Sequence, residues 1–193
     1  MTLLLELGDL RLLTDPVFDP PGGTYAFGWG TGSTKLTAPA VPVEALGTID
    51  AVLLSHDHHD DNLDRAGRAF LPRAGRVLTT TSGQKRLGGN AEGLTPWQST
   101  RLQAGTTTIT VTATPAQHGS LLVRPFAGQT LGFALTWEGQ QNGALYLSGD
   151  TIHYEGWKHF SEGRRDVEQA FLTGGLQEKL LWLPLGVPTV VEV

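Results

Sequence analysis

Residues 51–64 read Ala-Val-Leu-Leu-Ser-His-Asp-His-His-Asp-Asp-Asn-Leu-Asp, and this stretch decides the fold. It opens with a continuous apolar run, which is typical of a strand buried on both faces of a sheet. The nine residues after Ser55 hold three histidines and four aspartates, the densest group of metal-binding side chains in the sequence. Open α/β sheets place their ligand sites just past the carboxyl ends of such strands. The stretch therefore predicts a buried strand that leads into a metal-binding loop.

The spacing within this loop indicates which side chains share a face. His56, His58 and Asp60 occupy alternate positions, so an extended backbone points all three the same way. Their imidazole and carboxylate groups suit zinc or a similar divalent ion. His59 is out of phase with them, and we expect it to face away. The alternative interpretation is a solvated acidic turn, but two histidines and an aspartate at this spacing after a buried strand favour the metal site.

A helix is predicted directly after the loop, over residues 64–71. Apolar residues recur there at helical spacing, namely Leu63, Ala66, Ala69 and Phe70. Asn62 is the expected N-cap, and Asp64 lies in the first turn, where negative charge is favoured. Strand, ligand loop and helix thus follow one another in order.

Two later residues also follow predicted strands. His118 comes after a Thr- and Val-rich run over residues 106–113 that Pro115 ends. Asp150 comes after the apolar run of residues 145–147 and a glycine. If the chain folds back so that these strand ends meet the first loop, both side chains complete the metal site.

Four motifs, in this order and spacing, carry a resemblance to a known family: Leu13-Thr14-Asp15-Pro16, His56-x-His58-x-Asp60, Thr114-Pro115-Ala116-Gln117-His118 and Ser148-Gly149-Asp150-Thr151. With them the chain resembles the metallo-β-lactamase superfamily, and in particular its small UlaG-like branch of metal-dependent hydrolases. The resemblance implies an α/β fold of the αββα type, a four-layer sandwich in one domain over residues 1–193. It also implies one or two divalent ions between the sheets, zinc or sometimes manganese or iron.

The resemblance further implies a role for each matched residue. His56, His58 and His118 would hold one ion, Asp60 would belong to a second ion, and Asp150 would bridge the two. Asp15 would support the pocket without binding an ion.

Two departures from the family pattern stand out. The motif usually continues with a histidine after the aspartate, and this chain has Asp61 there, so the second ion would exchange an imidazole for an oxygen ligand. The family also commonly supplies a histidine near the C-terminus, and none follows His159. A natural short form, a lost tail or a partner subunit that closes the pocket would each account for this.

The expected activity is hydrolysis of an ester, lactone, amide or phosphodiester by a metal-bound hydroxide. Asp60 is the expected catalytic residue, which accepts a hydrogen bond from the bound water or binds the second ion. Lys35 or Tyr154 could polarise the substrate. The rival interpretation is a metal-binding protein without catalysis, sensory or structural, whose second metal site is degenerate.

Composition narrows the class of protein. The chain has 193 residues, 14 basic and 19 acidic, so we expect a small-molecule substrate and no nucleic-acid partner. The absence of cysteine excludes disulfides and thiolate zinc sites and fits a reducing cytoplasm. The start lacks the charged region of a signal peptide, and no apolar stretch approaches the roughly 20 residues that span a bilayer. A cytoplasmic enzyme is expected, with a homo-oligomer as one possible assembly.

The remaining elements are predicted from local patterns. Strands are expected over residues 3–7 and 10–13 as a hairpin, and over 131–137 and 144–147. A helix is expected around residues 162–172. Residues 22–32 are either a flap over the pocket or a β-hairpin. Trp97 is expected in the core, and His153 and His159 at the surface.

Overall fold

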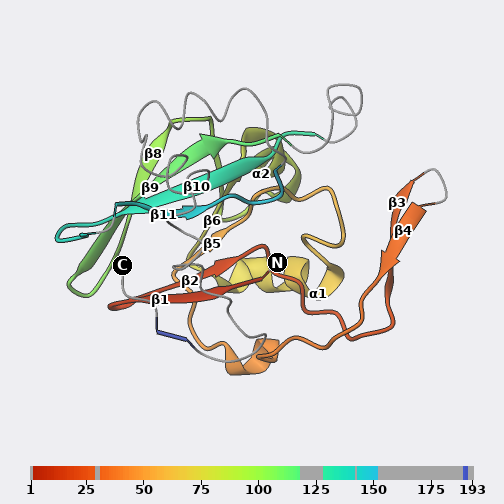
Figure 1. Ribbon diagram of the computed structural model, residues 1–193. Coiled ribbons are helices and arrows are strands. Elements are labelled where there is room, and N and C mark those ends of the chain that lie inside the picture. Colours follow the sequence, from red (N-terminus) through yellow and green to blue (C-terminus); the bar gives the residue numbers. More distant parts are fainter. Residues whose placement is uncertain (1, 29–30, 118–127, 142, 152–188, 191–193) are drawn as a thin grey trace, which may run out of the picture.

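The computed structural model describes residues 2–28, 31–117, 128–141, 143–151 and 189–190 (Figure 1). Its first sheet has five strands in the order β1-β2-β5-β6-β7. Their bounds are Leu4–Leu7, Leu10–Thr14, Ala51–Leu53, Arg76–Thr80 and Ala91–Leu94. β1 and β2 form an antiparallel hairpin, and β2, β5, β6 and β7 run parallel. The predicted buried strand, β5, is the middle strand of this sheet.

The second sheet is antiparallel, with four strands in the order β11-β10-β9-β8. In that order the bounds are Leu145–Leu147, Leu131–Thr136, Thr107–Pro115 and Ser99–Ala104. A separate hairpin of β3 (Thr24–Gly28) and β4 (Thr31–Thr34) stands apart from both sheets in Figure 1. The strands predicted over residues 3–7, 10–13, 131–137 and 144–147 are thus confirmed, and the segment predicted as a flap or a hairpin forms a hairpin over residues 24–34.

The helices of the described chain are short. They are η1 (Val43–Ala45), α1 (Arg65–Phe70), η2 (Leu71–Arg73) and α2 (Thr81–Leu87). The N-cap of α1 is Asp64, whose carboxylate accepts a 2.7 Å hydrogen bond from the backbone of Gly67. The prediction of Asn62 as N-cap is therefore wrong, because the Asn62 side chain binds Asp15 and the backbone of His56 instead.

The main core lies between the two sheets. Alternation along β5 sends Ala51 and Leu53 into this core and Val52 to the opposite face. The buried residues of the inter-sheet core are Leu10, Leu12, Ala51, Leu53, Leu78, Leu94, Leu102, Ile109, Val111, Ala113, Leu131, Phe133 and Leu135. They come from both sheets, so each sheet covers the apolar face of the other.

A second core lies on the other face of the first sheet. Val52, Val77 and Leu13 meet Phe70 and Leu71 there. Helix, sheet and sheet thus account for three of the four predicted layers, and the helix expected around residues 162–172 lies outside the described residues. Among the described residues, no helix is both long and apolar enough to cross a membrane.

Trp97 lies at the surface of the protein. Trp97 has 49% of its surface exposed and a φ of 71°, so the prediction that it packs in the core is wrong. A tight turn between β7 and β8 places it there, where its backbone N–H donates to the carbonyl of Ala113.

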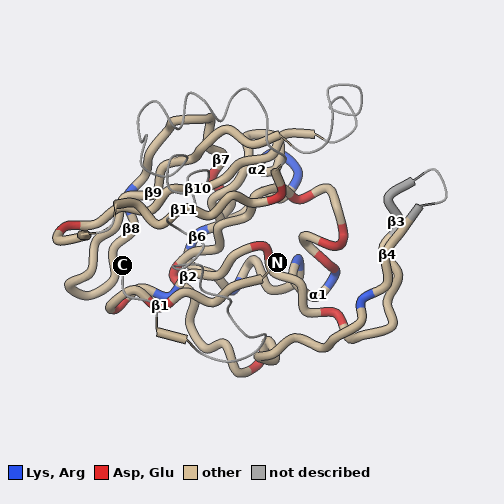
Figure 2. The backbone as a smooth tube through the Cα atoms, in the orientation of Figure 1, with Lys and Arg blue, Asp and Glu red and all other residues tan. Residues whose placement is uncertain are grey.

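In Figure 2, acidic and basic positions are scattered over the described chain and form no continuous basic stripe.

Gly67 in α1 provides a test of the packing between this helix and the end of β2. Alanine normally stabilises a helix interior by about 1 kcal/mol relative to glycine. A Cβ at position 67, however, would lie 1.9 Å from the carbonyl oxygen of Pro16. We expect Gly67→Ala to lower the free energy of unfolding by about 2 kcal/mol, measured by urea denaturation. Gly23→Ala is the control, because its Cβ would meet only Pro20 O at 3.9 Å; equal effects would contradict this account.

Candidate metal centre

The histidine loop, residues 54–64, follows the carboxyl end of β5 and forms a backbone hydrogen bond to each of the two sheets. The backbone N–H of Leu54 donates to Leu78 in the first sheet at 2.9 Å. One residue later, the carbonyl of Ser55 accepts from Leu131 at the start of β10, at 3.0 Å. The loop is therefore held from both sides at the edge where the predicted ligands were expected.

Three imidazoles of this loop gather at one point. One nitrogen from each of His56, His58 and His59 lies within 4.8 Å of the other two. His56 is fully buried, and the Nε2 of His56 and both ring nitrogens of His58 are shielded from solvent. The ring centroids are 4.4 to 5.2 Å apart. The described chain thus places three good nitrogen donors around one small volume.

This donor set fits a divalent ion. Nitrogens bound to one tetrahedral zinc at 2.0–2.1 Å lie about 3.4 Å apart. A separation at the upper limit of 4.8 Å therefore has to close by roughly 1.4 Å, which rotation of the side chains supplies. Imidazole nitrogen suits zinc, copper, iron and nickel, and three histidines with an open position are a known arrangement of catalytic zinc.

The position of His59 contradicts the prediction that it faces away. Alternation holds only while the backbone is extended, and the loop turns at this residue. The carbonyl of His59 accepts from the N–H groups of Asn62 and Leu63, at 3.1 and 3.0 Å. The turn brings the third imidazole round toward the first two.

The buried carboxylate of Asp15 holds the histidine loop in place through hydrogen bonds. Asp15, at the end of β2, accepts a 2.7 Å hydrogen bond from the backbone of Ser55 and a 3.1 Å bond from the Asn62 amide. Burial raises the pKa of the Asp15 carboxyl above its ordinary value, although these hydrogen bonds oppose the shift. Its φ of 35° is left-handed, which is uncommon outside glycine. These contacts hold the histidine loop, and the predicted role of Asp15 in supporting a metal pocket stays a prediction.

Ser55 also sets the orientation of the His56 ring. Its hydroxyl lies 3.0 Å from Nδ1 of His56 and accepts from the Asn62 amide at 3.2 Å. If Nε2 of His56 binds an ion, Nδ1 carries the proton and donates to Ser55, whose two lone pairs can accept both bonds. Neither Ser55 nor Asn62 was predicted to support the histidines, although Ser55 directly precedes His56 and Asn62 lies three residues after His59.

Asp57, between the first two histidines, points to the opposite side of the loop. It is buried and forms a two-point ion pair with Arg86 of α2, and Arg68 of α1 donates to its backbone carbonyl at 2.6 Å. Burial alone would raise the pKa of the Asp57 carboxyl, but the hydrogen bonds and charge of Arg86 and the charge of Arg68 outweigh it and lower that pKa.

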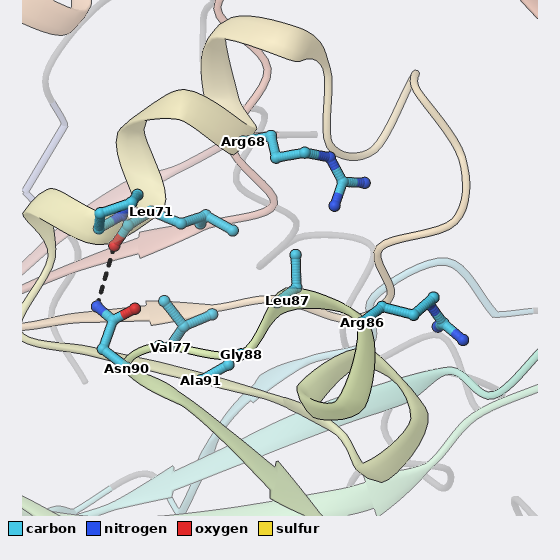
Figure 3. Close-up of a pocket in the computed structure, with 10 residues that line it drawn as sticks. Arg68, Leu71, Val77, Arg86, Leu87, Gly88, Asn90 and Ala91 are labelled. Atoms are coloured by element: carbon cyan, nitrogen blue, oxygen red, sulfur yellow. Dashed lines mark hydrogen bonds between the residues drawn. The ribbon is translucent and has the colours of Figure 1, made fainter.

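Arg68 and Arg86 also line a cavity of about 410 Å³ on the helix side of the first sheet. Figure 3 shows both side chains extending toward the same side, with Leu71, Val77 and Leu87 around the cavity. The histidines do not line this cavity. The two arginines therefore bind Asp57 on the side of the loop that faces this cavity and are not part of the histidine group.

The predicted acidic ligands are exposed. Asp60, Asp61 and Asp150 each have exposed side chains and are not part of the histidine group. His118 lies outside the described residues, as do His153, Tyr154 and His159. The assignments of Asp60, Asp61, His118 and Asp150 as ligands stay predictions.

Neighbouring contacts nevertheless bring two predicted loops to the centre. A Cβ on Gly149, the residue before Asp150, would lie 2.8 Å from Cβ of Ser55, so the backbones are in close contact. The N–H of Gln117, the residue before His118, donates to the Thr151 hydroxyl at 3.0 Å. The ends of β5, β9 and β11 therefore meet at one edge.

Lys35, a predicted substrate contact, is engaged elsewhere. Its ammonium lies 3.2 Å from the carbonyl of Val17 and 3.5 Å from the buried carboxylate of Asp64. Tyr25 of β3 also contacts Asp64, and burial together with the charge of Asp64 raises the pKa of Tyr25 to about 12. These contacts anchor the hairpin beside α1, and they argue against a role for Lys35 at the substrate.

This combination of fold and site agrees with comparisons to known proteins. A family model described as a beta-lactamase superfamily domain matches residues 10–183. The chain belongs to this superfamily, and its fold is the metallo-β-lactamase sandwich expected from the four motifs. The narrower UlaG-like assignment stays a prediction.

The relatives cover the chain unevenly. An uncharacterized protein of Mycobacterium tuberculosis is 41% identical over 59 residues, which make up 31% of this chain and 15% of that protein. An isothiocyanate hydrolase from Delia radicum gut bacteria is similar in structure, with a TM-score of 0.68 at 23% identity over 85% of this chain and 65% of that one. A possible metal-dependent hydrolase from Veillonella parvula has a TM-score of 0.65 at 19% identity with the same coverage. At these identities the structural likeness shows the fold alone.

The Asp57–Arg86 pair gives a pH-dependent prediction. Because the folded-state pKa of Asp57 is lowered from 3.8, the pair contributes stability above that pH and loses it as the pH falls through the lowered value. Asp57→Asn should cost about 1.5 kcal/mol at pH 7, with Arg86 half exposed, and less at pH 3.

Urea denaturation at both pH values measures this difference. Glu92→Gln is the control, because Glu92 forms a more exposed pair with Arg76 and should cost less than about 1 kcal/mol. A cost for Asp57→Asn that does not change with pH would contradict the assignment.

Proposed function

We propose that the protein is a metal-dependent hydrolase. The observation that carries this proposal is the group of three imidazoles, with donor nitrogens within 4.8 Å of one another, at the edge where β5, β9 and β11 end. Three nitrogen ligands leave coordination positions open, which is typical of a catalytic ion and not of a closed structural one.

The loop residues bind and orient the ion. Nε2 of His56 is the proposed ligand atom, since Nδ1 faces the Ser55 hydroxyl. A divalent ion held there would supply Lewis acidity, which lowers the pKa of a bound water toward about 7. Ser55, Asn62 and Asp15 hold the imidazoles in place through a chain of hydrogen bonds, so the donors need little reorganisation when an ion binds.

One carboxylate near the centre is proposed to accept a proton, and two others are proposed to bind a second ion. A carboxylate oxygen of Asp60, which is exposed next to the histidines in sequence, is proposed to accept the proton of the attacking water. Asp61 and Asp150 are proposed ligands of a second ion, and His118 is the alternative to His59 as the third ligand of the first. The close packing of Gly149 on Ser55 supports the placement of Asp150 beside the histidine loop.

We infer zinc as the ion, with manganese or iron as alternatives, and a small-molecule ester, lactone, amide or phosphodiester as the substrate. Membership of the UlaG-like branch and a homo-oligomer that closes the pocket belong to the same proposal. Because one structural neighbour is an isothiocyanate hydrolase, an isothiocyanate is a further candidate substrate.

Metal content and turnover together test the proposal. Protein without a histidine tag is purified without chelator, analysed for metal, and assayed against a panel of these substrate classes. The parent should hold at least about one equivalent of metal and turn over a member of the panel. His56→Ala should lose both metal and turnover, while Glu138→Ala, an exposed carboxylate between β10 and β11, should lose neither.

The rival function predicts a different result. A sensory or structural metal protein would hold its ion and hydrolyse nothing, and its melting temperature would fall when a chelator removes the ion. Metal that stays bound in His56→Ala would contradict both interpretations.

A further inference from the structure

The role of His59 goes beyond the ligands that the sequence motifs indicate. We propose that His59 binds the same divalent ion as His56 and His58, so that this one loop supplies three nitrogen ligands and neither Asp60 nor Asp61 replaces one of them. This inference rests on the proposed function only in that a divalent ion binds the loop.

The backbone makes this arrangement possible. The carbonyl of His59 accepts two backbone hydrogen bonds, from Asn62 and Leu63, which close a turn directly after the bend at Asp57 and His58. The turn places the ring of His59 4.4 Å from that of His58 and 5.2 Å from that of His56, measured between centroids. An extended continuation would have separated them.

Asn62 is the positioning residue of the turn. Its backbone N–H holds the carbonyl of His59 at 3.1 Å, and its side-chain amide donates to the carbonyl of His56 at 2.9 Å. The same amide reaches Asp15 at 3.1 Å, and only 4% of Asn62 is exposed. One buried residue therefore ties the first and third histidines to a common support.

Packing on His58 limits where the ion can lie. A Cβ on Gly128 would be 2.8 Å from Cε1 and 3.0 Å from Nε2 of His58, so the backbone before β10 covers one side of this ring. The rings of His56 and His59 lie 4.8 and 4.4 Å from that of His58, measured between centroids. His59 is half-buried, whereas Asp60 and Asp61 are exposed and would have to give up water to reach the same point.

Zinc titration of single variants tests the assignment. Outer residues of metal sites typically contribute 10–100-fold to affinity, so removing a direct ligand should cost more. We expect His59→Ala to weaken zinc binding by more than about 100-fold and Asn62→Ala by about 10–100-fold. Glu138→Ala, an exposed carboxylate between β10 and β11, is the control and should stay within about threefold of the parent.

Nitrogen-15 NMR of the parent protein provides a test that needs no variant. On addition of zinc, a ring nitrogen of His59 should shift together with those of His56 and His58, with the His59 signals assigned from their loss in His59→Ala. Circular dichroism of the metal-free variants shows whether each one folds.

The outcomes separate this inference from the proposed function. Zinc affinity retained in His59→Ala but lost in His56→Ala, with no shift of the His59 nitrogens, would overturn the role of His59 and leave the hydrolase proposal intact. Affinity lost in Asp61→Ala and retained in His59→Ala would assign the ligand to the carboxylate. Failure of the parent to bind zinc would overturn both.

Discussion

The buried carboxylate of Asp15 is the constraint on which the metal loop depends. A carboxyl group inside a protein loses its hydration, and only well-placed hydrogen-bond partners offset that loss. The donors here are the backbone of Ser55 and the amide of Asn62, one on each side of the histidines. The chain between them can adopt few conformations that satisfy Asp15. The orientation of His56 follows, because the same Ser55 and Asn62 contact its ring and its carbonyl.

The two sheets meet the loop through backbone contacts that leave no room for side chains. At Gly149 the φ is +61°, and a Cβ would lie 2.7 Å from the carbonyl oxygen of Leu131 and 2.8 Å from Ser55. This explains why a glycine precedes Asp150: any larger residue would push the end of β11 away from the loop. The contact between Gly149 and the histidine loop is thus a consequence of sheet packing.

Much of the fold could be predicted because its signals are local or periodic. The apolar run before Ser55 indicated a buried strand, and Gly8 between two leucine-rich segments indicated the β1–β2 hairpin. The alternate spacing of His56 and His58 correctly put both imidazoles on one side. In each case neighbouring residues within a single strand or turn determine the outcome.

The failures concern residues whose contacts are distant in sequence. Asn62 has the side chain of a helix cap, but Asp15, 47 residues earlier, uses its amide, and Asp64 caps the helix instead. His59 is the exception, because the turn that brings its ring toward the other two imidazoles is local and is closed by the N–H groups of Asn62 and Leu63. Arg86 and Asp57 are 29 residues apart and were not recognised as a pair. Only the folded chain shows these partners.

Anomalous diffraction at the zinc absorption edge from crystals of the zinc-loaded protein would test the central claim most directly. The account predicts a peak within coordination distance of nitrogens from His56, His58 and His59, with Nε2 of His56 facing it. A well-occupied peak elsewhere, or zinc-loaded crystals with no peak at this loop, would contradict the claim that the loop after β5 is the metal centre of the protein.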